Sequence, residues 1–188
     1  MLKKSLLLAT CACAVSACAV FLDPNDPGKD QQYVSVVNSL TWTNPLTGKR
    51  DGARSSWPLK TMAGQDEAFP LAQLKQCDGA GACAWGVMRA HRSLSAFTYL
   101  PGGVRLDMGL VVDVDRRQEA HRENFNTSLA IPSDVAALRG KKELRRSLTL
   151  QYGKVQHIDL DFGMGYDVCA LRYDGAGRAL DICEIPYI

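Results

Sequence analysis

The clearest pattern in the chain is an alternation of apolar and other side chains over residues 104–115. Every second residue there is apolar: Val104, Leu106, Met108, Leu110, Val112 and Val114. This period of two places the apolar side chains on one face of a β-strand. Weaker versions of the pattern predict further strands at 33–42, 84–90 and 94–100 (one bent strand or two), 125–131, 144–152, 155–162, 168–173 and 180–185. The predicted fold class is mostly β, an antiparallel sandwich or open barrel of about eight strands.

Two segments carry helix signals, so one or two short helices are expected beside the sheets. Residues 66–76 open with two acidic residues and hold Pro70 in their first turn. Residues 133–139 can be capped by Ser133 or Asp134 and are followed by Gly140.

One stretch predicts a long loop and one pair of residues predicts a hairpin turn. Residues 43–65 are rich in Asn, Pro, Gly, Ser and charged side chains, and polar loops of this length are often functional. Trp57 lies in this stretch and is either an exposed binding anchor or a core residue. Gly153-Lys154 predicts the turn of a hairpin made by the strands at 144–152 and 155–162.

The N-terminal residues form an export signal rather than part of the fold. Lys3 and Lys4 precede an apolar run over 5–15, which is too short for a transmembrane helix. The run ends in Val15-Ser16-Ala17-Cys18, which resembles the lipobox of bacterial lipoproteins. The resemblance implies removal of residues 1–17 and acylation of Cys18, including diacylglycerol on its thiol.

The same resemblance predicts where the protein is held. Ala19 follows the lipidated cysteine, which implies the outer membrane, because in such lipoproteins an aspartate there favours retention in the inner membrane. The alternatives are lipidation at Cys11 or Cys13, or an ordinary signal peptide with Cys18 free. The expected organisation is a signal peptide over 1–17, a lipidated flexible tether over 18–32 and an all-β domain over 33–188.

The charge of the chain excludes one class of partner. The net charge is +2, and Lys3 and Lys4 of the signal account for it. A nearly neutral mature protein has no electrostatic basis for binding nucleic acid. The expected partners are therefore the membrane, through the N-terminal lipid, and an unknown envelope protein.

Four cysteines follow the signal, namely Cys77, Cys83, Cys169 and Cys183. An even number in an exported chain predicts two disulfides, because the periplasm is oxidising. Three pairings are possible, and we favour Cys77 with Cys83 and Cys169 with Cys183. The first pair closes a short loop with two glycines, and the spacing of these cysteines does not fit a zinc site.

The second pair depends on the register of a terminal hairpin. A three-residue loop over 175–177 pairs Asp174 with Arg178 and brings Cys169 opposite Cys183. A four-residue loop pairs Tyr173 with Arg178 and places the two cysteines on opposite faces, because a slip of one residue turns every side chain of a strand over. The crossed pairings therefore remain open at this point.

The candidate chemistry is sparse. His157, Asp159 and Asp161 share one strand face and are residue types that bind divalent metals. However, residues four apart on a strand lie about 13 Å apart at about 3.3 Å per residue, so one strand cannot supply all three ligands. The ordinary interpretation is the wet face of an amphipathic strand, with His157 and Asp159 as speculative binding residues.

These observations favour a protein that acts by contact. The chain holds three histidines and no Gly-x-Ser-x-Gly motif, so no complete catalytic set is visible and no enzyme activity, cofactor or metal is predicted. The expected function is a non-catalytic binding or accessory module of an envelope assembly or adhesion system. The alternative is a periplasmic inhibitor of a hydrolase acting through loop 77–83, and a metal-dependent enzyme is the third reading.

Overall fold

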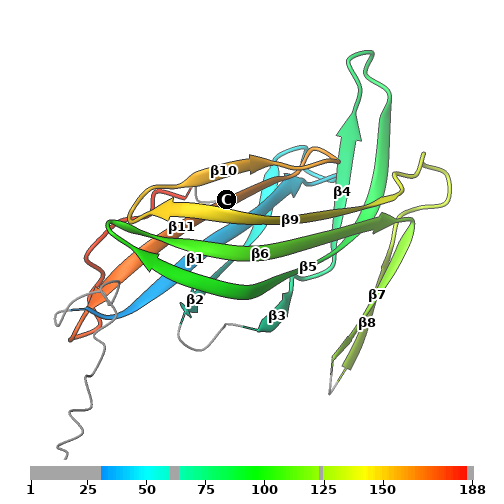
Figure 1. Ribbon diagram of the computed structural model, residues 1–188. Helices are drawn as coiled ribbons and strands as arrows, with labels where there is room; N and C mark the ends of the chain where they lie inside the picture. The colour runs from blue at the N-terminus through cyan, green and yellow to red at the C-terminus, as the bar shows by residue number, and fades with distance from the viewer. Residues whose placement is uncertain (1–30, 60–63, 123–124, 186–188) are drawn as a thin grey trace, which may run out of the picture.

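The computed structural model describes residues 31–59, 64–122 and 125–185 as a sandwich of two antiparallel β-sheets with two projecting hairpins (Figure 1). Its strands are β1 Gln31–Thr43, β2 Arg50–Pro58, β3 Gln65–Ala68, β4 Ala72–Cys77, β5 Cys83–Leu100, β6 Gly103–Asp115, β7 Arg117–Arg122, β8 Phe125–Ala130, β9 Gly140–Gln151, β10 Gln156–Asp159 and β11 Gly165–Asp174. The predicted sandwich is therefore confirmed, with more strands than expected. Among the described residues no helix is long and apolar enough to cross a membrane.

The four-stranded sheet has the order β10–β11–β1–β2, and β1, one of its two central strands, is buried on both faces. Val34, Val36 and Leu40 face the other sheet and belong to the main core. Val37, on the opposite face, packs with a second apolar cluster of Cys169, Leu171 and Ile185. The C-terminal segment after β11 therefore covers the outer side of this sheet.

The five-stranded sheet has the order β3–β5–β6–β9, with β4 also paired to β5. The alternation predicted over 104–115 is β6, whose apolar side chains are nearly inaccessible and fill the space between the sheets. β5 is one continuous strand of 18 residues with an irregularity between Leu94 and Ala96. It is the bent strand that the sequence allowed.

Two hairpins extend beyond the sandwich (Figure 1). The end of the β4–β5 hairpin rises from the body at the top of the view, and its tip is closed by the Cys77–Cys83 disulfide. The β7–β8 hairpin forms a separate two-stranded sheet that points away at the lower right.

Both predicted disulfides are confirmed, Cys77–Cys83 and Cys169–Cys183. The terminal turn has the three-residue register: the Asp174 N–H donates to the Arg178 carbonyl, and Tyr173 forms an isolated bridge with Ala179. The predicted strand at 180–185 is wrong, because this segment leaves the sheet after Leu180, whose N–H donates to the Arg172 carbonyl at 2.8 Å. Arg172 holds it instead, through a two-pronged ion pair with Asp181 at 2.7 and 2.8 Å.

Both predicted helices are wrong. Residues 66–76 hold parts of β3 and β4, because Ala72 and Leu74 alternate with polar residues and are buried against β5. This alternation favours a strand more strongly than the two acidic residues and Pro70 favour a helix. Residues 133–139 form no helix and run beside Trp85 instead. The backbone N–H of Trp85 donates to the Ala136 carbonyl at 2.8 Å.

The predicted loop over 43–65 is wrong in its middle, where β2 forms the edge of the four-stranded sheet. The predicted hairpin at Gly153-Lys154 is also wrong, because β9 and β10 belong to different sheets. Tyr152 instead forms a parallel bridge with Ala170, and the chain then crosses from one layer to the other.

The predicted signal peptide and Cys18 lie outside the described residues. β1 begins at Gln31, so the last two residues assigned to the tether at 18–32 belong to the sheet.

Candidate functional site

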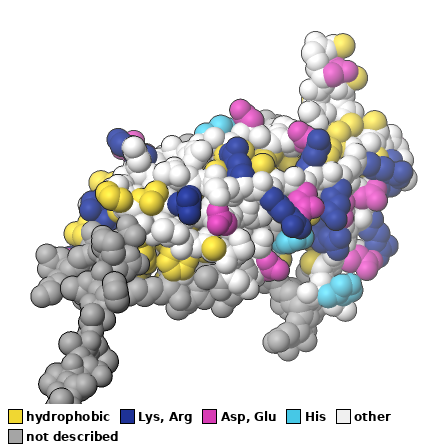
Figure 2. All heavy atoms as spheres, viewed as in Figure 1, with side chains coloured by type: hydrophobic (Ala, Val, Ile, Leu, Met, Phe, Trp, Pro, Cys, Tyr) yellow, Lys and Arg dark blue, Asp and Glu magenta, His cyan; other side chains and the backbone are white. Residues whose placement is uncertain are grey.

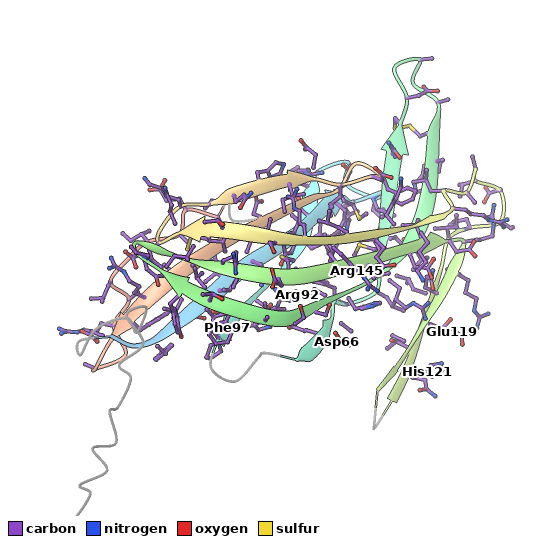
Figure 3. All side chains as sticks on the ribbon, viewed as in Figure 1. Asp66, Arg92, Phe97, Glu119, His121 and Arg145 are labelled. Carbon is purple, nitrogen blue, oxygen red and sulfur yellow. A yellow bond between two sulfur atoms is a disulfide. The ribbon has the colours of Figure 1, made fainter. Side chains whose placement is uncertain are left out.

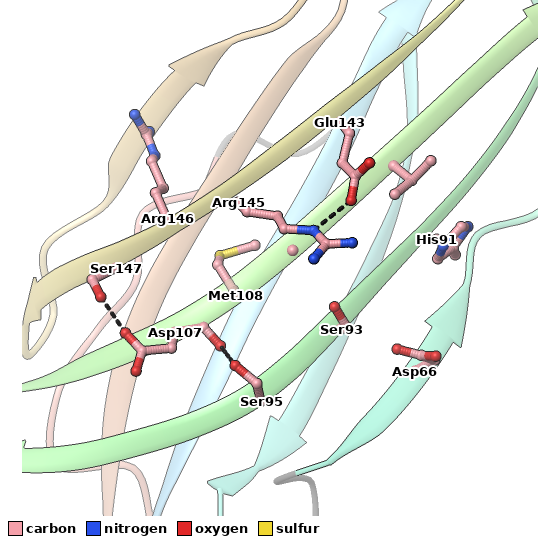
Figure 4. A pocket seen from close by; sticks show the side chains of 12 residues that line it. Asp66, His91, Ser93, Ser95, Asp107, Met108, Glu143, Arg145, Arg146 and Ser147 are labelled. Atoms are coloured by element: carbon pink, nitrogen blue, oxygen red, sulfur yellow. Dashed lines mark hydrogen bonds and ion pairs between the residues drawn. The ribbon is translucent and has the colours of Figure 1, made fainter.

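The outer face of the five-stranded sheet carries a hollow of about 570 Å³ (Figure 4). Asp66, Ser93, Gly109 and Arg145 are lateral neighbours across its middle, one from each strand of the sheet order. Because facing residues on neighbouring strands point the same way, this row forms a continuous strip of the outer surface.

The hollow exists because its central residues are small. A Cβ atom on Gly109 would lie 2.7 Å from the Ser93 hydroxyl oxygen, so even alanine would crowd this point. His91 and Glu143 stand on one side of the row, and Asp107 stands with Ser147 on the other. The larger side chains thus form walls around a shallow floor.

Some of the wall groups hold one another in place, as the dashed lines in Figure 4 show. Ser147 donates to the Asp107 carboxylate, and Ser95 donates to the Asp107 carbonyl at 2.9 Å. Arg145 donates from Nε to Glu143. These contacts orient the Asp107 carboxylate and the Arg145 guanidinium beside the hollow.

Other polar groups remain available to a ligand. Within the described part of the chain, Asp66, His91 and Ser93 form no hydrogen bond through their side chains. No bond therefore links Ser93 to His91, or His91 to Asp66, as a nucleophile and base would require. The arrangement offers both donors and acceptors, which suits the capture of a polar ligand.

The surface around the hollow mixes charges of both signs. Figure 2 shows basic and acidic side chains interspersed over the visible face, with no field of a single sign. Such a surface favours a partner of low net charge over a polyanion, because unlike neighbouring charges cancel the long-range potential.

The sequence-predicted residues His157 and Asp159 lie elsewhere, on β10 of the other sheet. His157 Nδ1 lies 2.6 Å from Asp167, and Nε2 lies 3.2 Å from Asp159. Asp161, the third member of the predicted strand face, pairs instead with Lys142 at 2.8 Å. Among the described residues no group of three or more His, Cys, Asp or Glu side chains is arranged to hold a metal ion.

The contacts of His157 lead to a pH prediction. The hydrogen bond with Asp167 is the largest cause that raises the pKa of His157, and Asp159 adds to it against partial burial. A raised folded-state pKa stabilises the fold below the unfolded-state pKa, and this contribution disappears as pH rises through the folded-state value. Asp167→Asn should lower the pKa of His157 more than the matched Asp159→Asn, as measured by NMR titration of the imidazole. An equal effect of the two variants would contradict the role of Asp167.

Trp57 is not an exposed anchor. It lies on β2 rather than in a loop, only 7% of its surface is accessible, and its ring is packed into the main core. The physical reason is pairing: Trp57 is the neighbour of Val36 on β1, so it shares the inward face of the sheet.

Trp57 belongs to a buried polar cluster around Arg92, which the sequence pattern did not reveal. Figure 3 labels Arg92 on the five-stranded sheet. The Arg92 side chain is completely inaccessible, lies over the Trp57 ring and pairs with Glu67. Glu67 also accepts a hydrogen bond from the indole N–H of Trp57. The Arg92 guanidinium donates another hydrogen bond to the Ser55 hydroxyl oxygen. The sequence did hold a signal for this cluster. Arg92 stands at a position where the alternation of Ala90 and Leu94 predicts an inward-facing apolar residue.

Burial sets the electrostatics of this cluster. Desolvation lowers the pKa of Arg92, and the nearby Tyr166 and Glu67 oppose that shift. Desolvation also raises the pKa of Tyr166, against the attraction of the guanidinium. Because Arg92 is enclosed, this cluster contributes to the packing of the sandwich, and the open hollow is the candidate site for a ligand.

Comparison with known proteins adds no assignment. No family model matches the chain, and neither a curated protein nor a solved structure matches it.

Proposed function

We propose that this chain is a lipid-anchored lipoprotein of the bacterial outer membrane whose sandwich is a non-catalytic binding module, an accessory part of an envelope assembly or adhesion system. The observation that carries the proposal is the open polar hollow of the five-stranded sheet. Asp66, His91 and Ser93 face outward on a rigid scaffold, and their side chains have no hydrogen-bond partner among residues 31–59, 64–122 and 125–185. Rigid strands suit recognition, because little conformational freedom is lost on binding.

Two features support the proposed location. The Val15-Ser16-Ala17-Cys18 sequence resembles a lipobox, and the two disulfides suit an oxidising compartment. Several acyl chains on one N-terminus would give stable anchoring, whereas a single chain binds a membrane only marginally.

Cys18→Ser tests the anchor. We expect this variant to accumulate as an unprocessed precursor or to leave the membrane fraction, because it lacks the thiol that accepts diacylglycerol. Fractionation and intact-mass measurement of the protein would show either result. Cys11→Ser is the matched control and should remain mature and membrane-bound. A processed, acylated Cys18→Ser protein would contradict lipidation at this residue.

A photo-crosslinking residue tests the binding face. Placed at Ser93, in the hollow, it should give one discrete adduct in cells, and Asp66→Asn or His91→Gln should reduce the yield of that adduct. The same residue at exposed Ser128, on the β7–β8 hairpin, is the control. Identification of the adduct by mass spectrometry names the partner. Equal adducts at both positions, or none at Ser93, would contradict the proposal.

A second candidate function is inhibition of a hydrolase, and the β4–β5 hairpin favours it. The tip over 77–83 is exposed, extends beyond the sandwich and is closed by a disulfide (Figure 1). Such a braced tip can enter a cleft without losing much conformational entropy. A crosslinking residue at Ala80 that captures a hydrolase, while Ser93 captures nothing, would favour inhibition over the binding face.

A further inference from the structure

A second cavity lies between the two sheets, at the open side of the sandwich where β9 and β10 are edge strands. Its apolar lining consists of Leu110, Val112, Leu144, Leu160, Phe162 and Met164. Its volume is about 150 Å³. That is room for about five groups of the size of a methylene or a water molecule. We call this cavity the interlayer cleft.

Phe162, at the edge of the interlayer cleft, has an unusual backbone. Its φ is 63° and that of Gly163 is 67°, and Met164 donates its N–H to the Asp161 carbonyl at 3.4 Å. Two consecutive positive φ values define a type I′ turn, in which Asn or Gly normally occupies the first position. A bulky residue in the left-handed region persists only when its surroundings hold it, and such residues concentrate at ligand sites.

The surroundings of the Phe162 ring show what holds it. A Cβ atom on Gly140, at the start of β9, would lie 2.9 Å from the tip of the ring, so the ring covers this glycine. Phe162 therefore spans from the β10–β11 turn to the first residue of β9. The Phe162 ring forms one wall of the cleft, and its backbone is strained in that position. An asparagine would suit the turn better but would leave that side of the cleft open.

The mouth of the interlayer cleft is charged. Lys142 on β9 and Asp161 on the facing turn form an ion pair at 2.8 Å, with 65% and 51% of their side chains exposed. Such an exposed pair contributes little, so a competing ion can replace one partner. Asp159 also lines the mouth, is 97% exposed and contacts His157 Nε2 at 3.2 Å, whereas Glu143 is held by Arg145. The carboxylates of Asp159 and Asp161 thus lie beside the single ammonium group of Lys142.

We propose that the interlayer cleft binds the alkyl end of a small amphiphile with a primary ammonium head. The alkyl chain lies among Leu110, Val112 and Leu144, and the ammonium group displaces Lys142 from Asp161. The excess of carboxylates at the mouth selects a cation over an anion. This site is on the opposite face of β6 and β9 from the hollow and does not depend on the proposed function.

Methyl-labelled NMR titration of the intact mature protein tests the proposal, with hexylammonium as the probe at mildly alkaline pH. We expect saturable shifts of the Leu110, Val112 and Leu144 methyl groups in the millimolar range, as befits so few ligand atoms. Hexanoate, with the same chain and the opposite charge, should bind about two- to five-fold more weakly. Equal binding of the two probes would show that the cleft does not select a cation, and shifts that do not saturate would show that it holds no ligand. Either result would overturn the proposal.

Two variants locate the site. Leu144→Phe should fill the cleft and abolish the shifts at the remaining methyl groups, while Leu46→Phe, at an 88% exposed position, should leave them unchanged. Thermal melting shows whether Leu144→Phe is folded. Asp161→Asn removes an exposed charge without burying new atoms, so it keeps the test valid if the first variant unfolds. It should weaken hexylammonium binding and leave hexan-1-ol binding unchanged, and an unchanged affinity for hexylammonium would contradict the role of Asp161.

Discussion

Replacing Glu67 by glutamine should clearly lower the free energy of unfolding of this sandwich. The Arg92 side chain is completely inaccessible, and Glu67 is its carboxylate partner. Removing one partner of a buried pair leaves the other as an uncompensated charge. We expect a loss of about 2–3 kcal/mol, below the 3–5 kcal/mol typical of fully buried pairs, because 36% of the Glu67 side chain is exposed. Urea unfolding followed by tryptophan fluorescence measures the change.

A double variant separates the charge from the contacts. Arg92→Met together with Glu67→Gln removes both charges, and the glutamine oxygen can still accept the indole N–H of Trp57. Replacement of a buried ion pair by neutral side chains is often close to neutral, so the double variant should be more stable than Glu67→Gln alone. If the double variant were less stable than Glu67→Gln, the guanidinium would be stabilising through its stacking on Trp57 and not through charge pairing.

Removing the Cys169–Cys183 disulfide should have the other large effect. The two cysteines are 14 residues apart, and closing a loop of that size contributes about 3 kcal/mol in the chain-entropy model. The bond also holds the C-terminal segment over Val37 and Leu171. Thermal unfolding of the double serine variant should show a loss of about 3 kcal/mol, and hydrogen exchange should become faster in β11.

The other disulfide is the matched control. Cys77 and Cys83 are six residues apart and close the tip of a projecting hairpin, away from the apolar clusters. Their double serine variant should therefore lose less stability than the Cys169 and Cys183 variant. An equal or larger loss would mean that the tip packs on the sandwich in solution.

The sequence predicts the strands whose burial differs between their two faces. β6 is recognisable because its apolar residues alternate with Arg105, Asp107 and other residues that are exposed or half-buried. β2 is not recognisable from its sequence. It is an edge strand rich in Ser and Arg, and its large apolar side chain, Trp57, stands near its end. Its place depends on pairing with β1, which no local pattern encodes.

The candidate sites depend on contacts that are distant in sequence. The hollow requires Ser93, Gly109 and Arg145 to be neighbours across three strands, and this register is set by tertiary pairing. The spacing of His157, Asp159 and Asp161 was visible, but only the fold shows that the first two contact each other while the third turns to Lys142. The Cys169–Cys183 pair was the favoured pairing because the short turn over 175–177 brings the two cysteines close together in one of its two possible registers.

The position of β1 has a mechanical consequence for a tethered protein. β1 lies between β2 and β11 and pairs with both along most of its length. A force that pulls on β1 from its N-terminal end acts along the strand. It would load the hydrogen bonds to β2 and to β11 in shear and at the same time, so that they would have to break together. Under the proposed lipid anchor, with a partner on the sandwich, β1 would therefore resist being pulled out of the sheet.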